Sequence, residues 1–278
     1  MKVDAHQHFW QYNPVEYGWI GDNMQVLKRD YLPADLLSEL KKVGFDGCIA
    51  VQARQTLDET NWLLKLASEN IFIKGVVGWV DLCSESIEAQ LQNYSRNPKL
   101  VGVRHVVHDE PDDQFMARES FRNGIRLLEK YNLTYDLLLF PKHLPLATEL
   151  VQAFPKQKFV LDHIAKPDIK NQLKEPWASS IKQLAQLPNV YCKLSGMVTE
   201  ADWSGWKAGD FTFYLETVLE SFGTDRVMIG SDWPVCKVAG NYPDVLSIVI
   251  DYMETRHKAA LPKVLGTNCL DFYNVKRS

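Results

Sequence analysis

Two histidines stand two residues apart near the start of the chain, in the stretch Asp4–Trp10 (DAHQHFW). Side chains at positions i and i+2 of a β-strand point to the same side. If Lys2–His8 forms a strand, His6 and His8 present two imidazoles to one place. Neutral imidazole is a hydrogen-bonding group and a common metal ligand, so the pair predicts a catalytic or metal site. The alternative is that both rings only hydrogen-bond backbone at the end of a strand.

Further ionisable residues follow apolar runs elsewhere in the chain. Five of the seven histidines lie at or just after predicted strands: His6, His8, His105, His108 and His163. Asp232 follows the apolar run Arg226–Gly230 in the same way. We therefore expect Asp232 and His163 to face the histidine pair across a closed barrel. For Asp232, capping the next helix is the competing interpretation.

Arg104 lies inside the apolar run Leu100–Val107, where a charge is costly without a polar partner. Contact with a substrate and contact with a structural carboxylate account for it equally well. His105 would point to the opposite side of the same strand, so the two side chains cannot both face the barrel interior.

Weaker candidates complete the predicted site. Gln52, Lys166 and Trp233 stand at or after strand ends and would orient hydroxyl or carboxylate groups of a ligand. Lysines after strands are often solvated, which is the plain interpretation of Lys166 and of Lys193. The remaining histidines are two predicted loop residues that could reach the site, His108 and His143, and a predicted surface residue, His257.

Eight apolar, strand-like runs are each followed by a helical pattern. The predicted strands are Lys2–His8, Gly47–Ala53, Lys74–Val80, Leu100–Val107, Leu133–Phe140, Lys158–Ile164, Asn189–Leu194 and Arg226–Gly230. The predicted helices are Pro33–Val43, Asp58–Asn70, Ser84–Tyr94, Asp113–Tyr131, His143–Phe154, Trp177–Leu187, Phe211–Phe222, Asp244–His257 and Pro262–Tyr273. This alternation predicts an α/β protein in which a parallel sheet is covered by helices, and its count and length are those of a (β/α)8 TIM barrel.

A doubly wound open sheet is the main alternative fold. The first strand–helix turn contains no GxGxxG phosphate loop, which removes the commonest reason to prefer that fold. No linker or change of composition divides the chain, so we expect one domain over residues 1–278.

Composition excludes several classes of partner. The net charge is −4, and no basic run of the kind that binds nucleic acid occurs. No apolar run approaches the roughly 18 residues that cross a bilayer, and the N-terminus lacks a secretory signal pattern. The five cysteines are scattered, which is typical of buried thiols in a reducing cytosol. We expect a cytoplasmic protein, and a homo-oligomer is left open.

Taken together, these motifs resemble the amidohydrolase superfamily. An HxH at the end of strand one, a histidine after strand six and an aspartate after strand eight are its pattern. The match covers nearly the whole chain and is closest to the amidohydrolase-2 branch, which contains sugar-lactone hydrolases of the L-fuconolactone and L-rhamnonolactone type and 2-pyrone-4,6-dicarboxylate lactonases. The motifs that carry the resemblance are DAHQHFW, YGWI, GVRH, LDHIAKP, KLSG, GSDWP and GTNCLDFY.

The chain departs from the binuclear members of the superfamily. Those members have a bridging carboxylated lysine on strand four and a histidine at the end of strand five, whereas here strand four offers Arg104 and strand five (TYDLLLF) has no histidine. The resemblance therefore implies at most one divalent ion such as zinc, held by His6, His8, His163 and Asp232. It also allows a site that works without metal, so no obligatory cofactor is expected.

The leading hypothesis is hydrolysis of a small sugar lactone to its hydroxy acid. Asp232 would act as general base on a water, and the cluster of His6, His8 and His163 would polarise the carbonyl. A mononuclear metal-dependent amidohydrolase or decarboxylase is the second hypothesis. The third, from another class, is a non-catalytic barrel that binds a sugar acid or a partner protein.

Overall fold

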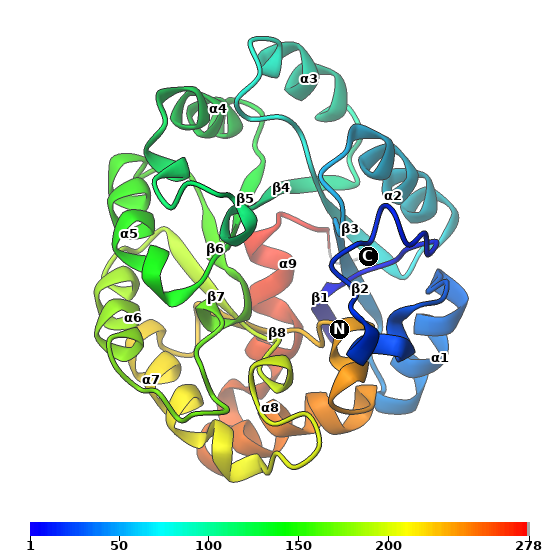
Figure 1. Ribbon diagram of the computed structural model, residues 1–278, viewed down its shortest axis with the longest axis vertical. Coiled ribbons are helices and arrows are strands. Elements are labelled where there is room, and N and C mark those ends of the chain that lie inside the picture. The colour runs from blue at the N-terminus through cyan, green and yellow to red at the C-terminus, as the bar shows by residue number, and fades with distance from the viewer. Residues whose placement is uncertain (277–278) are drawn as a thin grey trace.

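Eight parallel strands form the centre of the molecule. The structure of the protein is a computed structural model that describes residues 1–276 (Figure 1). The strands are β1 (Val3–Gln7), β2 (Gly47–Val51), β3 (Ile73–Gly78), β4 (Leu100–Val106), β5 (Thr134–Leu138), β6 (Phe159–Leu161), β7 (Val190–Leu194) and β8 (Val227–Ile229). They are hydrogen-bonded in chain order from β1 to β8, and every paired neighbour is parallel.

The sheet closes through the segments that follow its first and last strands. Gln7 forms a parallel bridge with Trp233. The backbone N–H of Asp232 donates to the carbonyl of His6 at 2.8 Å, and that of His8 donates to the carbonyl of Trp233 at 2.7 Å. The prediction of a (β/α)8 barrel is confirmed, and the closing contacts include four residues of the predicted site: His6, His8, Asp232 and Trp233.

Helices surround the ring of strands. They are α1 (Pro33–Val43), α2 (Leu57–Glu69), α3 (Ile87–Tyr94), α4 (Glu119–Lys130), α5 (Leu144–Ala153), α6 (Trp177–Ala185), α7 (Thr212–Phe222), α8 (Tyr242–Arg256) and α9 (Asn268–Phe272). In Figure 1, α9 is seen in the middle of the ring while the other helices lie around it. Its apolar residues pack with Val3 and Ala5 of β1, so α9 covers the end of the barrel at which the strands begin.

Helix α1 shows how local sequence sets an element's bounds. Pro33 occupies the first turn, and the Asp35 carboxylate accepts a hydrogen bond from the N–H of Leu32 at 2.9 Å. Gly44 ends the helix in a left-handed conformation with φ of 67°. Leu36 and Leu40 are buried, as the predicted apolar stripe requires.

Several predicted boundaries are wrong, and two of them, the ends of β1 and β6, concern the site. β1 ends at Gln7, one residue before His8. β6 ends at Leu161 because the chain turns at Asp162, whereas the apolar pattern continued to Ile164. α4 begins at Glu119, six residues later than Asp113, because extended backbone at Arg118 separates it from the preceding short turn.

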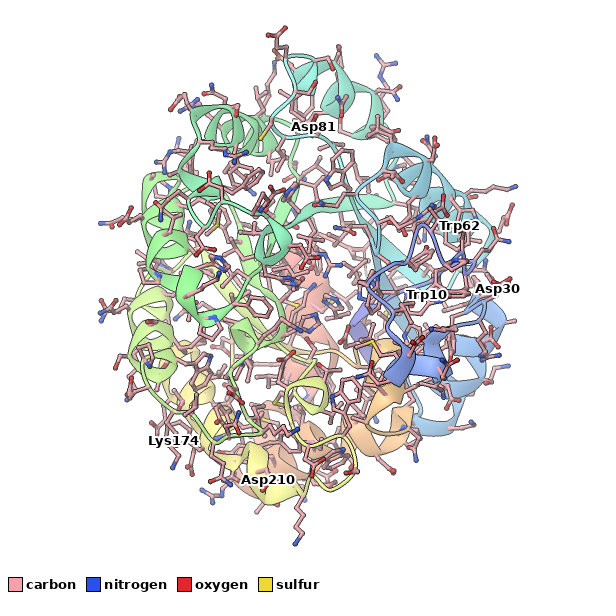
Figure 2. The ribbon with its side chains drawn as sticks, viewed as in Figure 1. Trp10, Asp30, Trp62, Asp81, Lys174 and Asp210 are labelled. Atoms are coloured by element: carbon pink, nitrogen blue, oxygen red, sulfur yellow. The ribbon has the colours of Figure 1, made fainter. Side chains whose placement is uncertain are left out.

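The surface and the thiols follow the expected pattern with one exception. Lys174 and Asp210 lie at the outer margin of the molecule, while Trp10 lies further in (Figure 2). All five cysteines are free and four are buried, whereas Cys83 is only half-buried, so the prediction that every thiol is a core residue is wrong there. Within residues 1–276, no helix is long and apolar enough to span a membrane.

Candidate active site

A bulge in β1 aims both histidines of the HxH motif at the barrel interior. The pairing with β2 shifts register between Asp4 and Gln7. The Gln7 amide donates to the Cys48 sulfur outside the barrel, whereas the Nε2 atoms of His6 and His8 lie 3.2 Å apart inside it. A bulge re-aims side chains in this way. The two imidazoles therefore converge, as the spacing predicted, although His8 has left the strand.

The ring of His8 is fixed by the neighbouring strand. Its Nδ1 lies 2.8 Å from the carbonyl oxygen of Val51, which can only accept, so Nδ1 carries the proton of the neutral ring. Nε2 then presents a lone pair to the site. It lies 3.4 Å from Oδ1 of Asp232.

Asp232 faces all three predicted histidines. Its Oδ1 lies 3.4 Å from Nε2 of His8, 3.8 Å from Nε2 of His163 and 3.9 Å from Nε2 of His6. Burial raises the pKa of Asp232, but the nearby His163, His8 and Lys166 outweigh it and hold that pKa below its ordinary value. The carboxylate is therefore ionised at neutral pH.

His163 lies in a left-handed turn. His163, Ile164, Ala165 and Lys166 have consecutive φ values of 53°, 49°, 63° and 50°, a conformation that costs L-residues about 1–2 kcal/mol each. Asp232 also has a positive φ, of 58°. Backbone strain of this kind clusters at functional sites.

Neighbouring polar groups secure the two strained segments. Nδ1 of His163 lies 2.9 Å from the Ser195 hydroxyl after β7. Asp4 accepts hydrogen bonds from the backbone N–H and the hydroxyl of Ser231, at 2.9 and 2.6 Å, which fixes the residue before Asp232. Asp4 was not predicted as part of the site.

A buried charge cluster lies beneath His6. Nη1 of Arg104 donates to Oδ2 of Asp162 at 3.0 Å and lies 3.2 Å from Nε2 of His6, and Nη2 donates to the Gln52 carbonyl. Asp162 Oδ1 lies 3.3 Å from Nδ1 of His6. Burial lowers the pKa of His6 well below the ordinary imidazole value, although Asp162 raises it, so His6 is neutral at neutral pH. Of the two partners considered for Arg104, the structure shows a carboxylate of the protein, that of Asp162.

Lys193 is fully buried, contrary to the expectation that lysines after strands are solvated. Its Nζ lies 2.5 Å from Oδ2 of Asp136 on β5 and 2.9 Å from Oδ1 of Asp162. Asp136 and Asp162 were missed by the sequence reasoning. The signal that singled out Arg104, a charged residue inside an apolar strand, applies equally to Asp136 in TYDLL.

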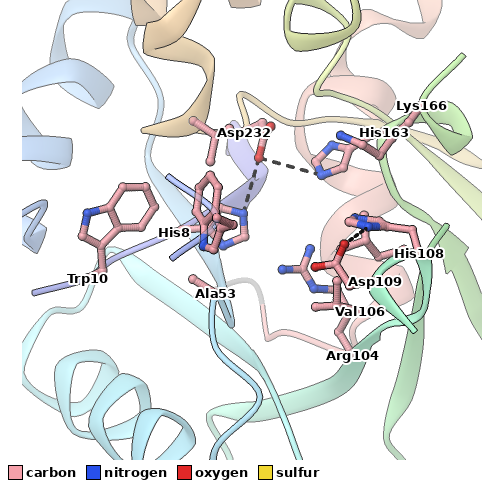
Figure 3. Close-up of a pocket in the computed structure, with 13 residues that line it drawn as sticks. His8, Trp10, Ala53, Arg104, Val106, His108, Asp109, His163, Lys166 and Asp232 are labelled. Atoms are coloured by element: carbon pink, nitrogen blue, oxygen red, sulfur yellow. Dashed lines mark hydrogen bonds and ion pairs between the residues drawn. The ribbon is translucent and has the colours of Figure 1, made fainter. Parts of the chain in front are cut away.

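A cavity of about 170 Å³ opens above these groups (Figure 3). Five of the predicted residues line it: His8, Arg104, His163, Lys166 and Asp232. Lys166 also pairs with Glu200 at 2.5 Å. Residues that the sequence reasoning had not assigned to the site form an apolar wall: Trp10, Trp19, Ala53, Val106, Leu138 and Val235.

Two predicted ligand-contacting residues lie outside the cavity lining. The Gln52 side chain is buried and donates to the backbone carbonyl of Arg104 at 3.3 Å. Trp233 is buried against Phe9 and Tyr31, with ring centroids 6.2 and 5.1 Å apart. Both residues support the walls of the site from behind.

Of the remaining histidines, only one lines the cavity. His105 points away from Arg104 and contacts Glu110 at 2.6 Å. His143 is buried beside Asp113 and does not line the cavity. His108 does line it, with Nδ1 2.7 Å from Asp109, and burial lowers its pKa to about 4.

The donor atoms fit a single divalent ion. A tetrahedral zinc with bonds of about 2.0 Å holds its ligand atoms about 3.3 Å apart. The separations of 3.2 Å between His6 and His8 and 3.4 Å between His8 and Asp232 match this spacing, whereas the third, 3.9 Å between His6 and Asp232, is longer. His6, His8 and Asp232 form one group able to hold an ion, and His6, Asp162 and His163 form a second that shares His6.

Comparison with known proteins identifies the family. A family model described as amidohydrolase matches residues 3–275. The chain belongs to the amidohydrolase family. The predicted membership of the amidohydrolase-2 branch and the predicted enzyme class, a hydrolase of the amidohydrolase superfamily, are confirmed.

Relatives extend the match over nearly the whole chain. An L-fucono-1,5-lactonase of Burkholderia multivorans is 40% identical over 270 residues, which are 94% of this chain and 91% of the relative. An L-fucono-1,5-lactonase of Burkholderia ambifaria is 34% identical over 283 residues, 99% of this chain and 96% of the relative. A crystal structure of a Burkholderia multivorans amidohydrolase with bound zinc has 38% identity and a TM-score of 0.93, and the match covers 99% of this chain and 100% of that one.

Proposed function

We propose that the protein hydrolyses a sugar lactone of the L-fucono-1,5-lactone type to its hydroxy acid. The observation that carries this proposal is the ionised carboxylate of Asp232 in the wall of a small cavity, beside the imidazoles of His8 and His163, which line the cavity, and of His6, which is buried behind them. The two relatives described above are L-fucono-1,5-lactonases, which supports the choice of substrate.

The cavity suits one sugar ring. Its volume of about 170 Å³ is smaller than the roughly 300 Å³ or more of pockets for drug-sized ligands. One side carries charged and imidazole groups, and the other carries Trp10, Trp19 and Leu138. A monosaccharide lactone with hydroxyl groups and one apolar substituent matches both sides.

In the proposed mechanism, Asp232 activates water. Its carboxylate accepts a proton as the water oxygen attacks the lactone carbonyl carbon, and the carbonyl oxygen gains the negative charge. The Arg104 guanidinium and the Lys166 ammonium, both at the cavity wall, stabilise this oxyanion. The bond from carbon to the ring oxygen then breaks, and the leaving alkoxide takes the proton from Asp232. No covalent intermediate with the protein is formed.

The imidazoles have two proposed tasks. Nε2 of His8, with its lone pair, accepts a hydrogen bond from the attacking water, while His6 and His163 flank the Asp232 carboxylate and limit its position. His6, His8 and Asp232 would hold one divalent ion, whose chemistry would be to polarise the lactone carbonyl as a Lewis acid. Dialysis against chelator, with activity and bound metal measured together, decides whether an ion is required: parallel loss of both means that it is.

Replacement of Asp232 by Asn tests the assignment of the base. The amide cannot accept the proton, so kcat for L-fucono-1,5-lactone should fall by about 10²–10⁴-fold, measured by release of acid in a weakly buffered indicator assay. Near-normal turnover would refute the role of Asp232. A panel of aldonolactones and dicarboxylate lactones tests the substrate class. Thermal stabilisation by these compounds without turnover of any of them would favour a non-catalytic binding barrel.

A further inference from the structure

His108 lies in the cavity wall with one ring nitrogen engaged and the other open. Its Nδ1 lies 2.7 Å from Oδ1 of Asp109, and its ring is tilted against that of Phe140 with centroids 4.7 Å apart. Within residues 1–276, Nε2 has no hydrogen-bond partner, and it is not among the unpartnered atoms that are sealed from solvent. The protein therefore holds the ring in place and leaves Nε2 accessible.

The contact with Asp109 decides which nitrogen of His108 carries the proton. A carboxylate can only accept, so Nδ1 carries the proton of the neutral ring and Nε2 presents a lone pair. No hydrogen-bond donor of the described residues contacts Nε2, so no contact opposes this tautomer. Burial lowers the pKa of His108 to about 4, and Lys166 and Arg104 act in the same direction, although Asp109 raises it. The ring is therefore neutral at neutral pH.

A bare Nε2 excludes one role for His108 and favours another. The leaving ring oxygen of a lactone needs a proton donor, and a nitrogen without hydrogen cannot be one. A hydroxyl group, in contrast, can donate to such a nitrogen. Sugar lactones carry several hydroxyl groups, and a few placed polar groups of this kind fix the orientation of a ligand in a pocket.

The other side of the cavity suits the apolar part of a sugar ring. Trp10 and Trp19 line it, and Figure 3 shows Trp10 across the cavity from His108. Indole rings offer a large apolar surface against which C–H groups and a methyl substituent pack. A lactone placed between these two walls turns hydroxyl groups toward His108.

We propose that His108 is a specificity-determining residue whose Nε2 accepts a hydrogen bond from a ring hydroxyl of the lactone, while Asp109 holds it in the accepting tautomer. This inference deepens the proposed function and rests on it for the identity of the ligand as a sugar lactone. It assigns selection among lactones to His108 and leaves the activation of water to Asp232.

The test measures the coupling between His108 and each hydroxyl of the ligand. The kcat/KM values of wild type and His108→Phe are compared for L-fucono-1,5-lactone and its 2-deoxy, 3-deoxy and 4-deoxy analogues. Phenylalanine keeps a ring against Phe140 and removes the acceptor. In the wild type, at least one deoxy analogue should lose about tenfold in kcat/KM, mainly through KM, and in His108→Phe that loss should shrink to about twofold or less.

His257→Phe is the matched control, because His257 follows α8 and does not line the cavity. This variant should discriminate among the four lactones as the wild type does. If the kcat/KM ratio of the parent lactone to every analogue is the same in His108→Phe as in wild type, the proposal is overturned. Wild-type protein that hydrolyses all three analogues as fast as the parent lactone also overturns it, and that result needs no variant.

A binding measurement separates this inference from the proposed function. The compound 1,5-anhydro-L-fucitol has the ring and the hydroxyl groups of the lactone but no carbonyl, so it cannot be hydrolysed. By calorimetric titration, its Kd should be about fivefold or more higher for His108→Phe than for wild type and unchanged for His257→Phe. If this difference is found and no lactone is hydrolysed, the proposed function fails and this inference stands. Equal Kd values for wild type and His108→Phe refute the inference, whatever the turnover.

Discussion

Glu59 offers a quantitative test of the electrostatics next to the site. The residue lies in the first turn of α2 and is fully buried. Its Oε2 accepts hydrogen bonds from the backbone N–H groups of Ala53, at 3.0 Å, and Arg54, at 2.7 Å. Ala53 lines the cavity, so Glu59 fixes part of its wall. Burial raises the pKa of Glu59 from 4.5 to about 7.

The direction of the pH effect follows from this raised pKa. Below pH 4.5 the Glu59 carboxyl is protonated in both the folded and the unfolded chain, and its favourable contribution is complete. As the pH rises through about 7, the unfolded chain ionises first, so the contribution is lost. At about 1.4 kcal/mol per pH unit, the whole loss is about 3 kcal/mol, of which about 1 kcal/mol has occurred by pH 5.

Glu59→Gln removes this titration and keeps an oxygen for the two backbone N–H groups. The free energy of unfolding of the variant minus that of the wild type should be about 2 kcal/mol larger at pH 8 than at pH 5. Reversible urea denaturation at the two pH values measures it. Glu69→Gln, an exposed change on the same helix, should show no such difference. A difference between Glu59→Gln and wild type that is equal at both pH values would refute the reasoning.

Three further predictions concern the cavity. Arg104→Met leaves Asp162 without one partner of a buried pair and should lower the free energy of unfolding by about 3–5 kcal/mol in urea; a loss below 1 kcal/mol would contradict the role of that pair. Gly196→Ala should reduce kcat/KM at least about tenfold, because φ is +62° and the new Cβ would lie 2.4 Å from Nδ1 of His163, while Gly209→Ala, with nothing within 4 Å, should be neutral. Trp19→Ala should raise KM by about three- to tenfold with little change in kcat; an unchanged KM would place the substrate away from that wall.

The alternation of side-chain direction along a strand correctly predicted part of the site. The alternation within GVRH requires Arg104 and His105 to point in opposite directions, and they do. The opposite directions of Arg104 and His105 depend only on the two-residue period of a strand, which a sequence displays directly. The convergence of His6 and His8 was predicted from the same period, but in the structure the bulge in β1 produces it.

Local sequence could not predict the turn at His163 or the partners of Lys193. The apolar run LDHIA reads as a continuing strand, yet the chain adopts four left-handed residues there because contacts from β7 and the loop after it hold them. Gln52 and Trp233 stand at strand ends like their neighbours, but their side chains do not line the cavity. Whether a side chain at a strand end lines the cavity depends on the bulges and turns beside it, which local sequence does not display.

The sequence by itself determined the eight strand–helix units and the residue types of the site. The spacing of apolar residues and the presence of a charged residue within an apolar stretch are local properties that the sequence displays directly. Only the tertiary structure decided which charges meet. Lys193, Asp136 and Asp162 come from three different strands or strand ends, and Tyr273 reaches them from the last helix. Their contacts exist because the barrel closes and α9 covers its floor, and closure is a property of all eight strands together.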